Sequence, residues 1–489
     1  MTTVVLSLIS HTNVGKTTLA RTLLRRDVGE VRDAAHVTEV ASSFTLIETA
    51  SGDALELWDT PGFGDSVRLL SRLRRSGNPL GWFLTQVWDR FTDRPFWSSQ
   101  QAVRNVRDEA DVVLYLVNAS EDPRSAAYVD AEMQILGWIG KPVLVLLNQL
   151  GPPRGPEAEA AEVAAWSEHL RPHACVRDTL AFDAFARCWI QEHVLLERIR
   201  AVLPAGCDET FDGLATAWRR RNEGVYERSM EVLAGQLAAL ARDSEELPEQ
   251  GLGQVARAAL GGLLGRERGH QAADRAMQAL VGRADAMLRN STAELIGLHG
   301  LSGTTTTEIH RRLGTDFDLR RAADAGKAGM LGAAISGALG GLAADLAAGG
   351  LTFGSGALIG GLLGVAGAHS LARAYNVARG TRATVVRWSE DFLTDRVVAA
   401  VLKYLAVAHF GRGRGDYVES ESPAHWRPLA QTVVGRRAAQ FSELWSAAAA
   451  GLGDAALRDA LLPLFSGAVT EVLQQLYPDR GPTRPAAPP

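Results

Sequence analysis

The chain has 489 residues, with 51 basic and 56 acidic side chains and a formal net charge of −5 at pH 7. A chain of this length should form two or three domains, and its nearly balanced charge gives no overall field that would attract nucleic acid. The three cysteines, Cys175, Cys188 and Cys207, have neither metal-site nor disulfide-framework spacing, which is typical of a reduced cytosolic protein. The first residues lack the basic flank of a signal peptide, so we expect a cytoplasmic location.

The first predicted elements are a strand over Val4–Ile9, a tight loop, and a helix that begins near Lys16. The loop ends in Val14-Gly15-Lys16-Thr17-Thr18, the ending of a phosphate-binding loop, with Ser10 in place of the usual first glycine. The backbone amides and the helix N-terminus would face phosphates, Lys16 would lie between the terminal phosphates, and the Thr17 hydroxyl would bind Mg²⁺. A chance Gly-Lys-Thr is the alternative, and the strand and helix on either side favour the phosphate loop.

A second group of candidate residues follows in the chain. Thr38, in a polar and irregular segment, is by its position the best candidate for a switch threonine that reaches Mg²⁺ and the last phosphate. Two strands are then predicted over Ser43–Glu48 and Ala54–Trp58, joined by a turn. They lead to Asp59-Thr60-Pro61-Gly62, where Asp59 can hold Mg²⁺ through water and the Gly62 N–H can meet the γ-phosphate.

The combination of Asn13-Val14-Gly15-Lys16-Thr17 with Asp59-Thr60-Pro61-Gly62 resembles the TrmE–Era branch of P-loop GTPases over residues 1–203. The resemblance implies an α/β fold, a doubly wound mixed sheet of the GTPase type, with GTP as substrate and Mg²⁺ as cofactor. It also implies that Asn13 can bind a K⁺ ion that neutralises charge in the transition state. The candidate catalytic residues are thus Lys16, Thr38, Gly62 and Asn13.

Phe63 stands where other GTPases place a water-orienting glutamine. We therefore expect hydrolysis to be slow unless K⁺ or a partner protein assists it. The alternative interpretation of Phe63 is a core aromatic residue, and both can hold together.

The base-binding end of the predicted site departs from the family pattern. Apolar runs over 111–118 and 143–147 predict central parallel strands, and the second ends in Asn148-Gln149-Leu150-Gly151, where the branch usually has Asn-Lys-x-Asp. Asn148 and the stem of Gln149 can still cup a purine, but Gly151 offers no carboxylate to guanine. Asp183, after a predicted strand over Thr179–Phe182, either replaces that carboxylate or caps a helix over Ala184–Val202.

Residues 63–110 form a long insertion after the switch, rich in arginine and in large aromatic side chains: Trp82, Phe83, Trp88, Phe91, Phe96 and Trp97. Such a segment would move with nucleotide state and could dock on the rest of the chain, on a partner, or on a membrane. The alternative, which the rarity of exposed aromatic clusters favours, is a buried joint with the following helical domain.

Beyond Pro204 the periodicity becomes that of amphipathic helices, as over Arg266–Leu298 and Val385–Leu405, with no alternating strand pattern. We therefore expect helical regions over 204–327 and 369–477 and a disordered tail over 478–489. This order of parts resembles a bacterial family that joins a TrmE–Era-type GTPase domain to a helical domain of unknown function.

Residues 328–368 contain 13 glycines and a single charged residue, Asp345. At about 1.5 Å per helical residue, the apolar run over 346–368 is long enough to span a bilayer, and glycines four apart allow helices to approach closely. Arginines at both ends favour a hairpin at the inner membrane with both ends in the cytoplasm. A pair of tightly packed helices inside a soluble bundle is the alternative.

The sequence thus predicts a GTP-binding and GTP-hydrolysing molecular switch that couples nucleotide state to a helical, membrane-touching effector domain. We expect guanine nucleotide and an unidentified protein as partners, and no nucleic acid. One alternative is a dynamin-like structural GTPase that acts on membranes. A third possibility, allowed by the altered base motif, is an ATP-using or non-hydrolysing nucleotide-binding protein.

Overall fold

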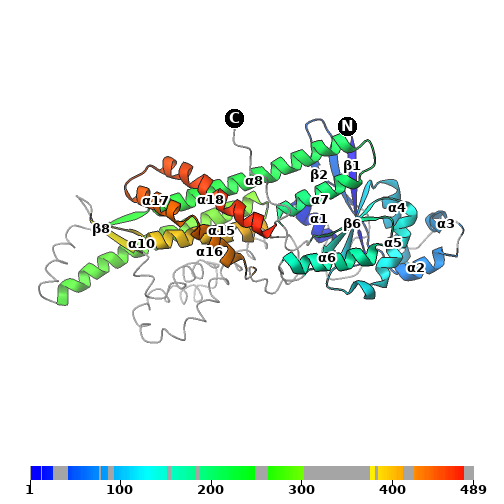
Figure 1. The fold of residues 1–489 in the computed structure, drawn as a ribbon, viewed down its shortest axis with the longest axis horizontal. Helices are drawn as coiled ribbons and strands as arrows, with labels where there is room; N and C mark the ends of the chain where they lie inside the picture. Colours follow the sequence, from blue (N-terminus) through cyan, green and yellow to red (C-terminus); the bar gives the residue numbers. More distant parts are fainter. Residues whose placement is uncertain are drawn as a thin grey trace. The chain divides into compact units, whose positions relative to one another are not determined.

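The computed structural model describes residues 2–12, 14–25, 42–75, 77, 79–85, 93–150, 156–182, 188–247, 263–301, 375–379, 384–410, 423 and 425–477. The chain divides into two compact units (Figure 1). Unit 1 comprises Met1–Val225, Ala408–Ser420 and Leu476–Pro489, and unit 2 comprises Tyr226–Val407 and Glu421–Gln475.

Unit 1 is built on a six-stranded mixed sheet with the order β2-β3-β1-β4-β5-β6. Its strands are β1 (Thr3–Ser10), β2 (Ser42–Glu48), β3 (Ala54–Asp59), β4 (Val112–Asn118), β5 (Val143–Asn148) and β6 (Val176–Ala181). Only β2 is antiparallel to its neighbour; the other pairs are parallel. Every residue of β5 is buried, as expected of a parallel strand covered on both faces. The predicted doubly wound mixed sheet is confirmed.

Helices cover both faces of this sheet (Figure 1). Side chains of β4 alternate between the faces, with Leu114 in one core cluster and Val113 and Tyr115 in the other. The first core includes residues of α1 (Lys16–Leu24), α7 (Trp189–Val202) and the beginning of α8 (Asp208–Arg242). The second includes residues of α2 (Ser66–Leu73), α3 (Pro79–Thr85), α4 (Arg94–Asp108), α5 (Ala127–Ile139) and α6 (Pro156–Leu170).

The aromatic residues after the switch contribute to this second core. Phe83 of α3 and Phe96 of α4 are buried in the same cluster as Tyr115 of β4, so they fill the interior of unit 1. The prediction that they form a joint with the helical domain is therefore wrong for these two residues. Trp88 and Phe91 lie outside the described residues.

Helix α7 begins later than predicted. Its first residue is Trp189, and its N-cap is Cys188, whose backbone N–H donates to Gln191 Oε1 at 3.0 Å. This reciprocal capping arrangement fixes the start of the helix. The prediction that Asp183 caps this helix is therefore wrong, and Asp183 itself lies outside the described residues.

Unit 2 is mostly helical, as predicted. It also contains a small sheet, which the sequence analysis did not predict. Its helices are the second part of α8, α10 (Leu263–Leu298), α15 (Glu390–Ala408), α16 (Trp426–Gly435), α17 (Ala438–Ala449) and α18 (Asp454–Leu476). The strands β7 (Ser244–Leu247), β8 (Tyr375–Arg379) and β9 (Thr384–Trp388) form an antiparallel sheet in the order β7-β9-β8.

The predicted helix over Val385–Leu405 is wrong in its first residues, which belong to β9. The β-branched pair Val385 and Val386 suits a strand, and both residues pair with β7 and β8. The helix begins only after Ser389, whose Oγ accepts a hydrogen bond from the Phe392 N–H at 3.2 Å.

Among the helices that the structure describes, none combines the length and the apolar character needed to cross a bilayer. The segment over 328–368, for which the sequence predicts a hairpin, lies outside the described residues, as does the tail over 478–489.

Candidate nucleotide site

The loop after β1 ends in a glycine whose backbone is left-handed. Gly15 is the N-cap of α1 and has a φ of 97°, in the left-handed region that favours glycine. A Cβ at this position would lie 2.7 Å from Asn148 Nδ2, so a side chain would also have no room. No acidic residue occupies the first turn of α1, so the helix itself supplies no carboxylate to its own first amides.

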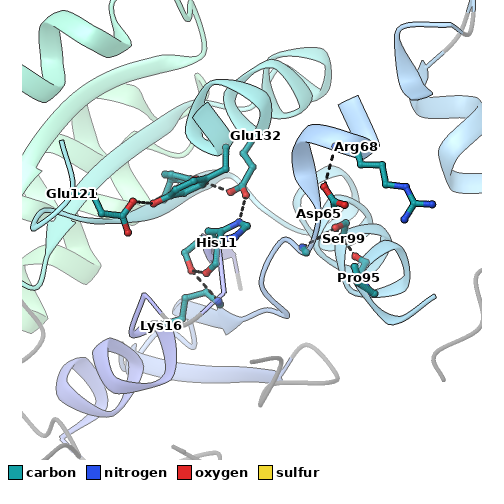
Figure 2. Close-up of polar contacts among 12 residues, drawn as sticks. His11, Lys16, Asp65, Arg68, Pro95, Ser99, Glu121 and Glu132 are labelled. Carbon is teal, nitrogen blue, oxygen red and sulfur yellow. Dashed lines mark hydrogen bonds and ion pairs between the residues drawn. The ribbon is translucent and has the colours of Figure 1, made fainter. Parts of the chain in front are cut away.

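Lys16, the first residue of α1, lies buried in the centre of this loop. Its Nζ donates to Ser10 Oγ at 3.0 Å (Figure 2), so the serine that replaces the usual first glycine contacts the ammonium directly. A Cβ at Gly62 would lie 3.0 Å from the same Nζ. Burial lowers the pKa of Lys16 from its ordinary value, while the charges of Asp59 and Glu132 act in the opposite direction.

A hydroxyl and a carboxylate meet beside Lys16. Thr17 Oγ1 donates to Asp59 Oδ2 at 2.6 Å, and both side chains are buried. The parallel register places Asp59 opposite Leu8 of β1, which brings the end of β3 to the phosphate loop. Hydroxyl and carboxylate oxygens are the ligands that Mg²⁺ prefers, so these two residues fit a metal–nucleotide complex.

The turn after β3 is tied to the end of β1. The Thr60 hydroxyl donates to the Leu8 carbonyl, and the Phe63 N–H donates to the Ser10 carbonyl at 2.9 Å. Phe63 is fully buried within the core cluster that holds Phe83 and Phe96. Its ring is therefore a core aromatic and packs in the interior of unit 1.

The end of β5 contacts the phosphate loop at the predicted base-binding end of the site. Asn148, at the end of β5, is fully buried, and its Nδ2 donates to the Val14 carbonyl at 2.6 Å. Gln149 has a φ of 58°, which is uncommon for a residue other than glycine and marks a constrained turn. Asn148 thus connects the predicted base-binding turn to the phosphate loop.

The structure brings most of the predicted residues together at the carboxyl ends of β1, β3 and β5, where ligands bind in open α/β sheets. These residues are Val14, Gly15, Lys16, Thr17, Asp59, Gly62 and Asn148. Thr18 is buried in the first turn of α1. Of the residues discussed for the nucleotide site, Asn13, Thr38, Gly151 and Asp183 lie outside the described residues.

A polar network beside the loop was missed by the sequence argument. His11 Nδ1 lies 2.8 Å from Glu132 Oε1, and Tyr115 OH donates to Glu132 Oε2 at 2.6 Å (Figure 2). Glu132 is fully buried although it belongs to α5, far from the loop in the chain. The only signal in the sequence is a histidine directly after Ser10, since nothing marks Glu132 as its partner.

A mixed sheet with a phosphate loop after β1 and an aspartate at the end of β3 defines unit 1 as a P-loop GTPase domain. Residues 5–149 match the family model described as 50S ribosome-binding GTPase. Residues 174–460 match the model described as Domain of unknown function (DUF3482), which covers more than half of the chain. The chain therefore belongs to the DUF3482 family.

Similar solved structures include Era in complex with MgGDPNP and nucleotides 1506–1542 of 16S ribosomal RNA, with 19% identity and a TM-score of 0.31. A variant of Era from Aquifex aeolicus bound to GDP and AlF4⁻ gives the same identity and TM-score. Each alignment covers 42% of this chain and 58% of the Era chain, so the match spans less than two thirds of Era. Toc33 from Arabidopsis thaliana has 14% identity and a TM-score of 0.23, over 38% of this chain and 73% of that chain. No curated protein matches the chain.

Proposed function

We propose that this protein is a GTP-binding and GTP-hydrolysing molecular switch that passes its nucleotide state to the helical second half of the chain. The observation that carries the proposal is the buried cluster in which Lys16 meets Ser10 while Thr17 meets Asp59. The match of residues 5–149 to a GTPase family supports a guanine nucleotide as the ligand.

In the proposed reaction, the chain acts by positioning and by charge. Lys16 holds the terminal phosphates, and Thr17, Asp59 and Thr38 hold Mg²⁺, which neutralises charge between the phosphates when it is bound. The Gly62 N–H senses the γ-phosphate, and Asn13 binds a K⁺ ion in the transition state. Phe63 has no hydrogen-bonding group with which to orient water and its ring is buried in the core, so in this proposal hydrolysis is slow without K⁺ or a partner.

Guanine recognition rests on Asn148, Gln149 and Asp183 in this proposal. Gly151 cannot supply the carboxylate that guanine requires, and Asp183 takes that role. The N-cap of α7 is Cys188, which removes the competing interpretation of Asp183 as the cap of that helix. ATP remains the alternative nucleotide if Asp183 does not contact the base.

Contacts around the switch turn support a relay from the γ-phosphate to α2 and α4. The Gly64 N–H donates to Ser99 Oγ at 3.1 Å, and a Cβ at Gly64 would lie 2.5 Å from the Pro95 Cα. Asp65 caps α2 by accepting from the Arg68 N–H at 3.1 Å (Figure 2). A movement of Gly62 toward the γ-phosphate would therefore displace the starts of both helices.

A second set of contacts connects α1 to α8 within unit 1. The Arg25 guanidinium, at the end of α1, donates to Asn222 Oδ1. Buried Glu192 of α7 accepts from Trp218 Nε1 at 2.6 Å and from Asn222 Nδ2 at 2.9 Å. Arg25 directly precedes the segment that contains Thr38. We therefore propose that a nucleotide-dependent movement of that segment is passed to α8 through Arg25.

Limited proteolysis of the full chain tests the relay. With a non-hydrolysable GTP analogue and with GDP, cleavage after the arginines between Arg68 and Arg94 should differ in rate, because α2 and α4 move with the switch turn. Identical cleavage in both states contradicts the relay. Hydrolysis assays with K⁺ replaced by Na⁺ test the proposed role of Asn13, and an unchanged rate removes it.

The proposal includes membrane contact through residues 328–368. Sedimentation of the full chain with liposomes, in GTP analogue and in GDP, tests this part separately. A protein that stays in the supernatant in both states favours packed helices, and nucleotide-dependent assembly on the liposomes favours the dynamin-like alternative.

A further inference from the structure

Ser10 is the residue at which this phosphate loop departs from the usual pattern, which has a glycine without any side chain there. It is the last residue of β1 and is fully buried. Its Oγ donates to the His11 carbonyl and accepts from Lys16 Nζ at 3.0 Å. A hydroxyl carries a single proton, so the bond to His11 leaves the oxygen as an acceptor for the ammonium.

The backbone of Ser10 contacts the switch turn at the same time. Its carbonyl accepts from the Phe63 N–H at 2.9 Å, and the next residue, His11, forms a parallel bridge with Phe63. Phe63 directly follows Gly62, whose N–H is proposed to sense the γ-phosphate. Ser10 therefore contacts the phosphate-binding lysine through its side chain and the switch turn through its carbonyl.

The Lys16 ammonium lies directly beside Gly62, because a Cβ at Gly62 would be only 3.0 Å from Nζ. An ammonium has three N–H donors, and Ser10 accepts one of them, so donors remain for phosphate oxygens. Since Gly62 is proposed to meet the γ-phosphate, the position in which Ser10 holds Lys16 is the γ-phosphate end of the site. A nucleoside diphosphate has no group there.

We propose that Ser10 is a positioning residue that holds the Lys16 ammonium beside Gly62 and thereby makes the site prefer a nucleoside triphosphate to a diphosphate. The inference rests on the proposed nucleotide binding. Without the hydroxyl, the flexible stem of Lys16 can carry the ammonium away from Gly62, which weakens the contact with the γ-phosphate. The backbone amides of the loop still bind the phosphates that GDP and GTP share.

Calorimetric titration of the full chain in Mg²⁺, with a non-hydrolysable GTP analogue and with GDP, tests this preference. Ser10→Ala should lower the affinity for the analogue about tenfold and that for GDP less than about twofold, because a buried hydrogen bond to a charged group is lost at the γ-phosphate end. Ser10→Gly, which restores the usual residue, should give the same change. Ser10→Thr keeps the hydroxyl and should retain the wild-type ratio of the two affinities.

Ser7→Ala is a matched control on the same strand. Ser7 is fully buried like Ser10, and its hydroxyl donates to Asn105 Oδ1, away from Lys16. Its loss should lower the free energy of unfolding, measured with denaturant, and leave the ratio of analogue to GDP affinity at the wild-type value. A merely structural role for Ser10 would give this same result in Ser10→Ala.

The two possible failures can be told apart. If Ser10→Ala and Ser10→Gly keep the wild-type ratio, or if they raise it because the hydroxyl competes with phosphate for the ammonium, the inference about Ser10 is overturned and the nucleotide site stands. The same holds if Ser10→Thr changes the ratio as Ser10→Ala does. If the folded wild type binds neither the analogue nor GDP, the proposed function fails and the inference with it.

Discussion

Unit 1 and unit 2 each bury a lysine to the same extent, with 7% of Lys16 and 7% of Lys403 exposed. The surroundings differ. Two carboxylates, Asp59 and Glu132, act electrostatically on Lys16, which directly follows the left-handed Gly15. Lys403 Nζ donates to three neutral acceptors, Gln236 Oε1 at 3.1 Å, the Leu288 carbonyl at 3.3 Å and Ser291 Oγ at 2.9 Å.

These different surroundings indicate a structural role for Lys403 and agree with the binding role proposed for Lys16. Burial lowers the pKa of both lysines, and the pKa of Lys403 falls to about 7, because the charge of Arg396 lowers it further. Lys403 joins α8, α10 and α15 by hydrogen bonds to their polar groups. A buried lysine is therefore no sign of a phosphate site in itself. The carboxylates, the strand ends and the left-handed Gly15 distinguish Lys16.

The largest expected effect comes from removing the charge at Lys16. Lys16→Ala should weaken Mg²⁺–GTP binding roughly 100- to 1,000-fold, because a buried, hydrogen-bonded charge is lost from the phosphate loop. Fluorescent GTP-analogue binding measures the change. If Lys403→Met weakens nucleotide binding as much as Lys16→Ala does, the distinction between the two buried lysines is wrong. Lys141→Ala is the control for the loss of a lysine elsewhere in the chain.

The next effect concerns the metal. Asp59→Asn should reduce the Mg²⁺-dependent part of nucleotide affinity roughly 10- to 100-fold, because the carboxylate that meets Thr17 is replaced by an amide. Nucleotide titrations in Mg²⁺ and in EDTA separate the Mg²⁺-dependent part of the affinity from the Mg²⁺-independent part. If the variant loses equal affinity in EDTA, Asp59 acts on folding or on the phosphates and not through Mg²⁺.

A smaller effect tests the base end of the site. Asp183→Ala should lower the ratio of GTP to ATP affinity about tenfold, since guanine would lose a charged hydrogen-bond acceptor. Competition of both nucleotides against one fluorescent analogue gives this ratio. An unchanged ratio removes Asp183 from guanine recognition and leaves the choice of purine open.

The last prediction concerns the stability of unit 2 and not nucleotide binding. An exposed lysine has a pKa of about 10.4, so between about pH 7 and that value the unfolded chain holds a proton that folded Lys403 does not. The free energy of unfolding should therefore rise with pH in this window, by at most about 1.4 kcal/mol per pH unit, and the gain is lost as the pH falls toward 7. Denaturant unfolding of the wild type and of Lys403→Met checks the difference.

Lys403→Met should remove that rise, whereas Lys141→Met, a matched loss of a lysine elsewhere, should keep it. A parallel pH profile for the wild type and Lys403→Met would show that Lys403 keeps its charge in the folded protein. The structural role assigned to it would then need an anionic partner.

Sequence reasoning succeeded where local pattern decides the structure. The apolar runs of β4 and β5 predicted the central strands of the sheet, and the order of the motifs predicted that Thr17 and Asp59 lie close together. Strand β9 was missed because Val385 and Val386 adjoin a helical sequence, and their partners in β7 lie far away in the chain. Periodicity within a window of residues cannot detect such pairing.

Two further errors have the same origin. Phe83 and Phe96 were assigned to a joint with the helical domain because composition shows that aromatics are buried, but not against what. The pair of His11 and Glu132 has no motif, since it depends on α5 packing beside the loop. Tertiary packing decides both where Phe83 and Phe96 are buried and which residue contacts His11, and a single sequence does not reveal that packing.

The central claim is that a nucleoside triphosphate with its divalent ion binds at the loop around Lys16. Isothermal titration calorimetry of the intact, folded chain with Mg²⁺ and a non-hydrolysable GTP analogue tests it most directly. We predict a saturable binding heat with one site per chain that disappears in Lys16→Ala. If neither the GTP analogue nor its ATP counterpart gives binding heat with the wild type, the claim is contradicted.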